Sequence, residues 1–319
     1  MARTPRYDRL ATELRNRASA KLDRMDPEAI ARLMNREDVR AVRAVGRVSG
    51  AIARAVDAIV AALAGGGRLF FVGAGTSGRL GVLEAAECPP TFGTRPSLVQ
   101  AIMAGGRSSV FRSREGAEDD AAAAARAVRR RVRSDDVVVG VSASGVTPFV
   151  RGALAAARHQ GAGTILVVCN EASARGVGAT LVIAPAPGPE VLAGSTRLKA
   201  GTATKLVLNT LTTASMTRLG RVYGNRMIDV QPRSRKLRER AIRLVAELGR
   251  VPTPRARRAL AASDGSVRAA IVIARTSCSP GTAARALRQS GGSLDAALAA
   301  LREIRGASPR RRSRPSPAR

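Results

Sequence analysis

The chain has 319 residues, 45% of them hydrophobic and only 2% aromatic, and its formal net charge is +30. This length allows about two domains with an ample core. The charge is almost entirely arginine, in a chain also rich in alanine, glycine and proline, all of which have GC-rich codons. Because aromatic side chains that could stack on bases are scarce, we do not expect a nucleic-acid partner.

The sequence also argues against a metal centre, a disulfide framework and a membrane span. Its three cysteines, Cys88, Cys169 and Cys278, are far apart, and its one histidine is His159. No apolar run approaches the roughly 18 residues of a membrane-spanning helix, and the N-terminal segment has no apolar signal-peptide core. We therefore expect a cytoplasmic protein with no membrane partner.

In chain order, residues 1–64 are predicted to form an N-terminal helical region that packs on the core, because apolar residues recur there at helical spacing. Residues 65–230 alternate short apolar strands with helices, which is typical of a doubly wound parallel sheet. The predicted strands are 69–72, 97–103, 136–141, 164–169 and 180–183.

The first predicted strand runs into the turn Gly73-x-Gly75-x-x-Gly78. Glycines let the backbone bend sharply and approach a ligand closely, while Thr76 and Ser77 would cap a helix whose free N–H groups bind anions. Adjacent hydroxyls and helix amides together suit the oxygens of a phosphate monoester. A well-capped helix without a ligand is the plainer interpretation.

The same glycine spacing is the dinucleotide-binding fingerprint, which would imply a nicotinamide enzyme. That fingerprint requires an acidic residue at the end of the next strand to bind the ribose. The strand at 97–103 is followed by Ala104, Gly105 and Gly106, so the required acid is missing. The sequence therefore favours phosphate binding over dinucleotide binding.

A second turn of the same kind follows the strand at 136–141, with hydroxyl groups at Ser142, Ser144 and Thr147. The carboxyl ends of neighbouring parallel strands lie at one edge of a sheet. A single ligand could therefore be held by both turns.

Three helices are expected around these turns. The first is predicted to stop at Pro89-Pro90, just beyond Glu87. Residues 115–132 should form the second, with acids early and arginines late, as the helix dipole prefers. The third is predicted to open near Lys199, with Glu190 in the turn before it, and a solvated helix start is the alternative for these two residues.

The C-terminal part of the chain differs in composition and in its pattern of apolar residues. Residues 306–319 are rich in arginine and proline without large apolar side chains, which predicts a disordered basic tail. Residues 231–305 are predicted to form a small domain of short amphipathic helices, with breaks at Pro252, Pro254, Gly265, Pro280 and Gly291-Gly292.

Long motifs occur in order between residues 9 and 300: GAGTSGRLGVLEAAECPPTFG, EGAEDD, VVVGVSASGVTPFV, GSTRLKAGTATKLVLNTL and RVYGNRMIDV. They resemble the N-acetylmuramic acid 6-phosphate etherases of the sugar isomerase (SIS) superfamily. The resemblance implies a three-layer α/β/α SIS core with N-terminal helices and a small C-terminal helical domain. It also implies a homodimer without cofactor or metal.

The family reaction splits the lactyl ether of N-acetylmuramate 6-phosphate into N-acetylglucosamine 6-phosphate and D-lactate during cell-wall recycling. By resemblance, its two catalytic carboxylates correspond to Glu87, the expected acid, and Glu118, the expected second acid/base. Two are needed because one removes the C2 proton of the open-chain sugar while the other assists the departing lactate. Which glutamate performs each transfer is open; Glu84 and Glu115 are neighbouring acids outside the pattern.

The same resemblance implies which residues bind the sugar and phosphate. The chain departs from the family at Val146, where arginine is common, and in the segment SSVFRS before EGAED. These departures concern substrate affinity more than the type of reaction. The implied binding residues are Gly75, Thr76, Ser77, Ser142, Ser144 and Thr147, with Glu190 and Lys199 as weaker candidates.

A noncatalytic sensor is the competing function. Glucokinase regulatory protein resembles the same family but binds sugar phosphates as a signal and inhibits a partner. A sensor needs the hydroxyl-rich turns but not both acids. The presence of Glu87 and Glu118 therefore favours an enzyme whose substrate is a small sugar phosphate.

Overall fold

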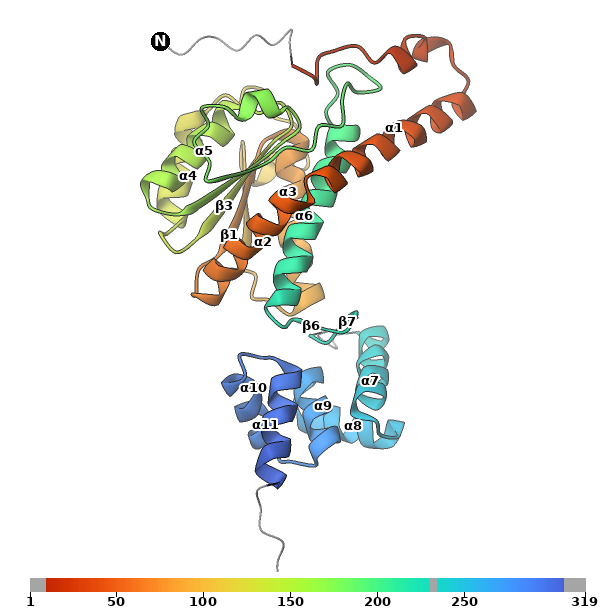
Figure 1. Cartoon of the computed structure of the whole chain (residues 1–319), viewed down its shortest axis with the longest axis vertical. Coiled ribbons are helices and arrows are strands. Elements are labelled where there is room, and N and C mark those ends of the chain that lie inside the picture. Colours follow the sequence, from red (N-terminus) through yellow and green to blue (C-terminus); the bar gives the residue numbers. More distant parts are fainter. Residues whose placement is uncertain (1–9, 230–233, 307–319) are drawn as a thin grey trace, which may run out of the picture. The chain divides into compact units, whose positions relative to one another are not determined.

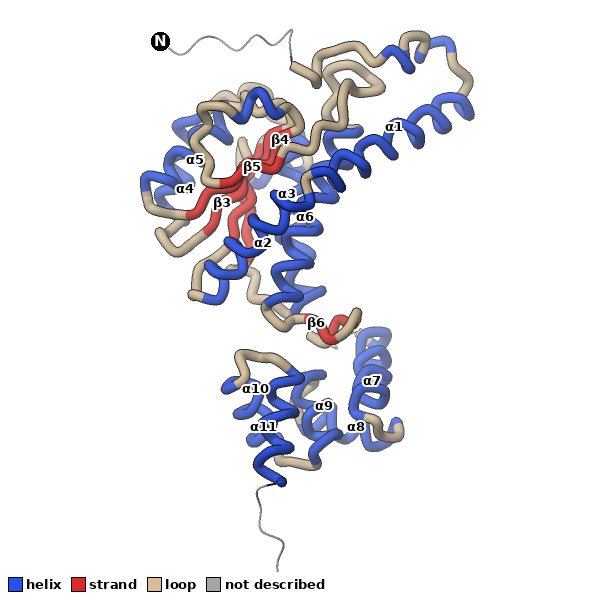
Figure 2. Tube along the Cα trace, viewed as in Figure 1, coloured by secondary structure: helices blue, strands red, loops and turns tan. Residues whose placement is uncertain are grey.

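The computed structural model describes residues 10–229 and 234–306 (Figure 1). Helices make up most of it, and the strands are short (Figure 2). Within those two ranges no helix is both long and apolar enough to cross a membrane. The tail predicted at 306–319 lies, apart from its first residue, outside the described residues.

The chain divides into two compact units. One consists of Met1–Pro89 and Thr94–Met216, and the other of Pro90–Gly93 and Thr217–Arg319. The four-part division drawn from the sequence, with boundaries after residues 64, 230 and 305, stays a prediction.

The first unit is built on a five-stranded parallel sheet with the order β2-β1-β3-β4-β5. This confirms the predicted parallel core. Every residue of β1 and β3 is buried, which explains why both segments are continuous apolar runs. The strands are β1 Leu69–Gly73, β2 Val99–Met103, β3 Val137–Ser142, β4 Gly163–Val168 and β5 Leu181–Ile183.

Helices cover both faces of this sheet, so the predicted three-layer α/β/α architecture is confirmed (Figures 1 and 2). On one face, α4 and α5 pack with Phe70 and Leu166 in one buried cluster. On the other, α3 lies so close that a Cβ at Gly81 would be 2.8 Å from the Phe71 Cβ. The helices of the two layers are α2 Ser49–Ala64, α3 Gly75–Phe92, α4 Ala121–Arg131, α5 Pro148–His159 and α6 Lys199–Arg218.

Among the described residues of the N-terminal segment, the first α-helix begins at residue 27, later than predicted. Two short 3-10 turns, η2 (Arg17–Ser19) and η3 (Leu22–Arg24), precede α1 (Pro27–Arg47). Asp26 caps α1, because its side chain accepts a hydrogen bond from the Ala29 N–H at 2.8 Å. The predicted helices of this region are therefore α1 and α2.

The helix α3 does not stop at Pro89-Pro90 as predicted but continues to Phe92. Proline removes an intrahelical hydrogen bond and crowds the preceding turn, so local chemistry favours an earlier end. Cys88 and Phe92 flank the prolines and are only 1% and 6% exposed. Their burial favours the last turn and outweighs the local preference.

The predicted helix at 115–132 also differs, because α4 begins only at Ala121. The Asp120 side chain accepts a hydrogen bond from the Ala123 N–H at 2.7 Å and so caps the helix. The residues before it form a turn. Glu118 consequently lies outside the helix.

In the described residues of the second unit, a short antiparallel hairpin precedes a group of helices. The hairpin, β6 (Val222–Tyr223) with β7 (Arg226–Met227), was not predicted. The predicted short helices are confirmed, although Pro254 and Pro280 lie in first helical turns, where proline is tolerated. The helices are α7 Arg235–Gly249, α8 Thr253–Ala262, α9 Val267–Thr276, α10 Pro280–Gln289 and α11 Leu294–Gly306.

Asp136 fixes the amino ends of β1 and β3 to each other. Its buried carboxylate accepts hydrogen bonds from the backbone N–H groups of Arg68 and Arg133, at 2.8 and 2.7 Å. It also accepts one from the Arg68 guanidinium at 2.7 Å. This hydrogen bond raises the pKa of Arg68 against the opposing effect of burial.

Replacing Asp136 with alanine should lower the free energy of unfolding by about 3 kcal/mol, because the Arg68 charge and two N–H groups lose their buried partner. Urea denaturation followed by circular dichroism measures the change. Asp135→Ala is the matched control: its side chain is exposed, and its effect should stay within about 0.5 kcal/mol. Equal losses in the two variants would contradict this role of Asp136.

Candidate active site

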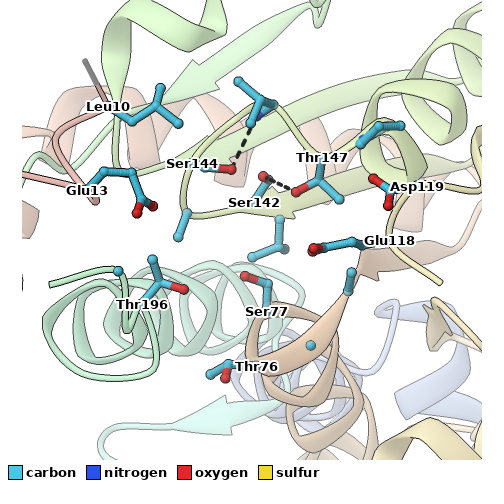
Figure 3. A pocket seen from close by; sticks show the side chains of 17 residues that line it. Leu10, Glu13, Thr76, Ser77, Glu118, Asp119, Ser142, Ser144, Thr147 and Thr196 are labelled. Carbon is cyan, nitrogen blue, oxygen red and sulfur yellow. Dashed lines mark hydrogen bonds between the residues drawn. The ribbon is translucent and has the colours of Figure 1, made fainter. Parts of the chain in front are cut away.

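A cavity of about 320 Å³ lies at the carboxyl ends of β1 and β3 (Figure 3). The register pairs Gly73 with Val141, so the two hydroxyl-rich turns begin side by side. The cavity brings together most of the predicted site residues, namely Gly75, Thr76, Ser77, Glu118, Ser142, Ser144 and Thr147.

Thr76 and Ser77 lie in the first turn of α3, and Ser77 directs its hydroxyl into the cavity (Figure 3). This turn returns very close to β1. A Cβ at Gly78 would lie 2.3 Å from Met103 Sδ and 2.5 Å from the Gly73 carbonyl oxygen, so glycine is required there. The first N–H groups of a helix have no intrahelical acceptor, and they therefore favour an anion at this end of the cavity.

The second turn holds its hydroxyl groups through hydrogen bonds of its own. Ser142 Oγ lies 2.9 Å from Thr147 Oγ1 and accepts a hydrogen bond from the Gly145 N–H at 3.0 Å. Ser144 Oγ accepts one from the Val146 N–H at 3.4 Å. The oxygens are thus oriented before a ligand binds, which reduces the ordering cost of binding.

Glu118 lines the same cavity from the turn before α4. The Phe149 N–H donates to the Glu118 carbonyl oxygen at 2.9 Å, which joins this turn to the start of α5. Its side chain is exposed, and within the described ranges its carboxylate makes no hydrogen bond or ion pair. Figure 3 shows the carboxylate near Ser77 and the second turn, where it can exchange protons with a bound molecule.

Glu87 does not line this cavity. It is exposed on α3, twelve residues after Gly75. At 1.5 Å per residue this is about 18 Å along the helix axis. A single copy of the chain therefore does not bring Glu87 and Glu118 together.

The two neighbouring acids lie in different surroundings. Glu84 is buried and accepts hydrogen bonds from Asn209 Nδ2, at 2.7 Å, and from Thr212 Oγ1, both on α6. Burial raises the pKa of Glu84, against the effect of these hydrogen bonds. Glu84 thus joins α3 to α6, whereas Glu115 is exposed and lines a smaller, adjoining cavity.

Glu190 and Lys199 are buried and do not line the cavity. The Glu190 carboxylate accepts hydrogen bonds from the Lys199 and Ala200 N–H groups, each at 2.9 Å, and so stabilises the start of α6. Lys199 Nζ lies 2.6 Å from Glu37 Oε2 and donates to the Pro187 carbonyl oxygen at 3.3 Å. Both residues therefore hold residues 187–200 in place, the segment whose Gly194 and Thr196 line the cavity.

Several residues that line the cavity were not predicted. Asp119 and Thr196 lie within the family motifs, so a signal for them existed. Leu10 and Glu13 lie far in sequence from every motif, so no sequence signal pointed to them. The Gly194 N–H, which donates to the Thr12 carbonyl oxygen at 3.0 Å, brings their segment to the site.

Residues 51–158 match the family model of the glucokinase regulatory protein N-terminal SIS domain. Over 94% of its length the chain is 51% identical to the N-acetylmuramic acid 6-phosphate etherase of Gloeobacter violaceus, of which it covers 98%. The chain belongs to the N-acetylmuramic acid 6-phosphate etherase family. The resemblance read from the motifs is thereby confirmed.

A further member of the etherase family, from Symbiobacterium thermophilum, is 50% identical over 83% of this chain and 88% of that protein. Among solved structures, the phosphoheptose isomerase GmhA from Neisseria gonorrhoeae has a TM-score of 0.46 and 16% identity, over 60% of this chain and 100% of that chain. In this etherase-family chain, residues 10–229 and 234–306 contain no group of three or more His, Cys, Asp or Glu side chains that could hold a metal ion.

The buried pair behind the cavity wall is sensitive to pH. Glu37 also accepts a hydrogen bond from Asn16 Nδ2 at 2.7 Å. Burial raises the pKa of Glu37, but the hydrogen bonds from Lys199 and Asn16 outweigh it and leave the pKa below its ordinary value of 4.5. A carboxyl group with a lowered pKa stabilises the fold above its ordinary pKa and loses this contribution as the pH falls through the lowered one.

Lys199→Met should lower the free energy of unfolding by about 3 kcal/mol at neutral pH, because Glu37 loses its buried cation and keeps only the exposed Arg40, whose Nη1 lies 3.0 Å from Glu37 Oε1. The difference from the wild type should shrink as the pH falls below 4.5, where Glu37 takes up a proton. Urea denaturation over a pH series measures both effects. Lys205→Met, an exposed position on the same helix, is the control. A difference that does not depend on pH would contradict the role of the pair.

Proposed function

We propose that this chain cleaves the D-lactyl ether of N-acetylmuramic acid 6-phosphate, giving N-acetylglucosamine 6-phosphate and D-lactate. It acts as a carbon-oxygen lyase in the recycling of peptidoglycan amino sugars in the cytoplasm. One observation carries the proposal: an exposed carboxylate, Glu118, faces two hydroxyl-rich turns across one cavity. The identity of the substrate is inferred from membership of the etherase family.

The two turns are proposed to hold the sugar phosphate. The phosphate would accept hydrogen bonds from the first-turn N–H groups of α3 and from Thr76 and Ser77. Ser144 and Thr147, on the second turn, would then bind the sugar hydroxyl groups. Glu190 and Lys199 act in this proposal by positioning the wall, since neither lines the cavity.

The chemistry is an elimination followed by an addition of water. In the open-chain sugar the C2 proton is alpha to the aldehyde and the lactyl oxygen on C3 is beta to it. A base removes the C2 proton, the C2–C3 double bond forms, and the C3–O electron pair leaves with lactate, which takes up a proton. Water then adds its oxygen to C3 while C2 regains a proton. Glu118 is proposed to carry one of these proton transfers.

Glu87, the second catalytic carboxylate implied by the family, could act only from another copy of the chain. Glu87 is too far along α3 to act with Glu118 of its own chain. The same stretch of α3 exposes Leu83, which is 46% accessible, and α1 exposes Val42, at 55%. Glu87 is exposed beside Leu83, which leaves this part of α3 open to a second copy of the chain. We propose a homodimer in which Glu87 of the partner subunit completes each site.

Glu118→Gln should lower the rate of lactate release at least about 10²-fold, the lower end for loss of a general acid/base. Glu171→Gln, an exposed acid that lines neither this cavity nor the smaller one beside it, is the control and should retain most of the activity. In heavy water, elimination places deuterium at C2 of the product. In oxygen-18 water it places the label on C3.

Label on lactate would contradict elimination, because it would mean hydrolysis at the lactyl carbon. Unlabelled C2 would do the same. Tight binding of N-acetylmuramate 6-phosphate by the wild type without any release of lactate would favour the noncatalytic sensor instead.

Mixing two inactive variants tests the shared site. If Glu87 of one copy acts with Glu118 of the other, co-folded Glu87→Gln and Glu118→Gln chains should regain about a quarter of wild-type activity. Half of the dimers are then mixed, and one of the two sites in each has both glutamates. Each variant folded alone is the control. Mixed dimers that are isolated and remain inactive would rule out the shared arrangement.

A further inference from the structure

A second, smaller cavity adjoins the candidate active site. It shares Ala74, Gly75 and Glu118 with the larger cavity, so Glu118 stands at the boundary of both. Its volume is about 150 Å³. This is the space of roughly five water molecules, enough for a small organic acid but not for a hexose phosphate.

Two arginines line this smaller cavity, Arg79 from α3 and Arg114 from the segment before Glu118. Arg79 Nε donates to the Val110 carbonyl oxygen at 2.8 Å, and its Nη2 donates to the Ser109 carbonyl oxygen at 2.9 Å. These hydrogen bonds fix the guanidinium in place. In the part of the chain that the structure describes, neither arginine forms an ion pair, although Glu115 and Glu118 line the same cavity.

Ser109 adds a hydroxyl group that has no partner. The residue belongs to the 3-10 turn η4 (Arg107–Val110), is only 3% exposed and lines the cavity. Its Oγ is buried and makes no hydrogen bond within the described ranges. A buried hydroxyl without a partner is costly and rare. Its position here indicates a ligand that accepts a hydrogen bond from it.

Gly105 keeps the space beside this hydroxyl open. Its φ is +75°, and a Cβ at that position would lie 2.2 Å from Ser109 Oγ and 3.3 Å from Arg114 Cδ. Any larger residue would be strained in its backbone and would crowd both polar groups. The positions of the Ser109 hydroxyl and the Arg114 side chain therefore depend on this glycine.

We infer that the smaller cavity binds the lactyl carboxylate of the substrate, an inference that rests on the proposed function. Arg79 and Arg114 provide the positive charge, and Ser109 Oγ donates a hydrogen bond to a carboxylate oxygen. The phosphate on C6 and the lactyl group on C3 extend from different parts of the sugar, as the two cavities extend from Glu118. The glutamate then lies beside the C3 ether bond. Glu115 and Glu118 also line this cavity. The side chains of Arg114 and Glu115 are both exposed, so water and salt weaken the charges of both, whereas Arg79 is half-buried and held by its hydrogen bonds.

Three ligands test this subsite: N-acetylmuramate 6-phosphate, the same compound with its lactyl carboxylate converted to a carboxamide, and N-acetylglucosamine 6-phosphate. Binding of each ligand is measured by calorimetric titration of the Glu118→Gln protein, because this substitution slows cleavage of the first ligand. The acid should bind roughly ten-fold or more tightly than the carboxamide, as expected for hydrogen bonds to a charged group. Adding Arg114→Gln should remove most of this preference while the affinity for N-acetylglucosamine 6-phosphate stays unchanged.

Arg112→Gln is the matched control, because Arg112 is exposed on the same segment and lines neither cavity. It should keep the full preference for the acid. Ser109→Ala, which leaves both charges in place, should reduce the preference by a smaller factor than Arg114→Gln.

Equal binding of acid and carboxamide by the Glu118→Gln protein would overturn the subsite. So would an Arg114→Gln change that weakens all three ligands alike. Lactate release by the wild type is measured separately. Absence of release would defeat the proposed reaction, whereas release without a preference for the acid would defeat only the subsite.

Discussion

The parallel pairing of β1 with β3 is the constraint on which the rest of the first unit depends. Asp136 joins the amino ends of these two strands through Arg68, and their register sets Gly73 opposite Val141 at the other ends. A slip of one residue would turn every side chain of a strand toward the opposite helix layer, so the packing of both layers specifies the register. Two turns that are far apart in the sequence are therefore held against one cavity.

Much of this arrangement was predictable because its signals are local. Continuous apolar runs marked the strands, and glycines followed by hydroxyl residues marked the turns. The errors arose where a distant contact opposed a local preference. Pro89-Pro90 indicated the end of α3, but burial of Cys88 and Phe92 extends the helix. Acidic residues early in the segment indicated a helix from residue 115, whereas the Asp120 cap starts it later. Glu118 was therefore expected inside this helix, whereas it lies in the turn before it.

The site itself was less predictable than the fold, because environment decides what a glutamate does. Glu84 is buried against α6, Glu118 faces a cavity, and Glu87 is exposed about 18 Å along its helix from the first turn. Nothing in the local sequence separates these three surroundings. The same holds for Lys199, whose partner Glu37 lies in a helix that carries no motif. Motifs identified which residues matter, while only the fold separated groups that line the cavity from groups that position its wall.

The hydrogen bonds between loops also determine how the cavity can move. The Phe149 N–H holds the turn of Glu118 to the helix that follows the second hydroxyl turn, so both turns belong to one wall of the cavity. On the opposite side, the Gly194 N–H holds the segment of Thr196 to that of Glu13 through Thr12. The cavity is thus bounded by two walls, each joined by a backbone hydrogen bond between segments that are far apart in the sequence. The backbone of Glu118 is fixed relative to the second hydroxyl turn, whereas its side chain, exposed and without a hydrogen-bond partner in the described ranges, can still change rotamer.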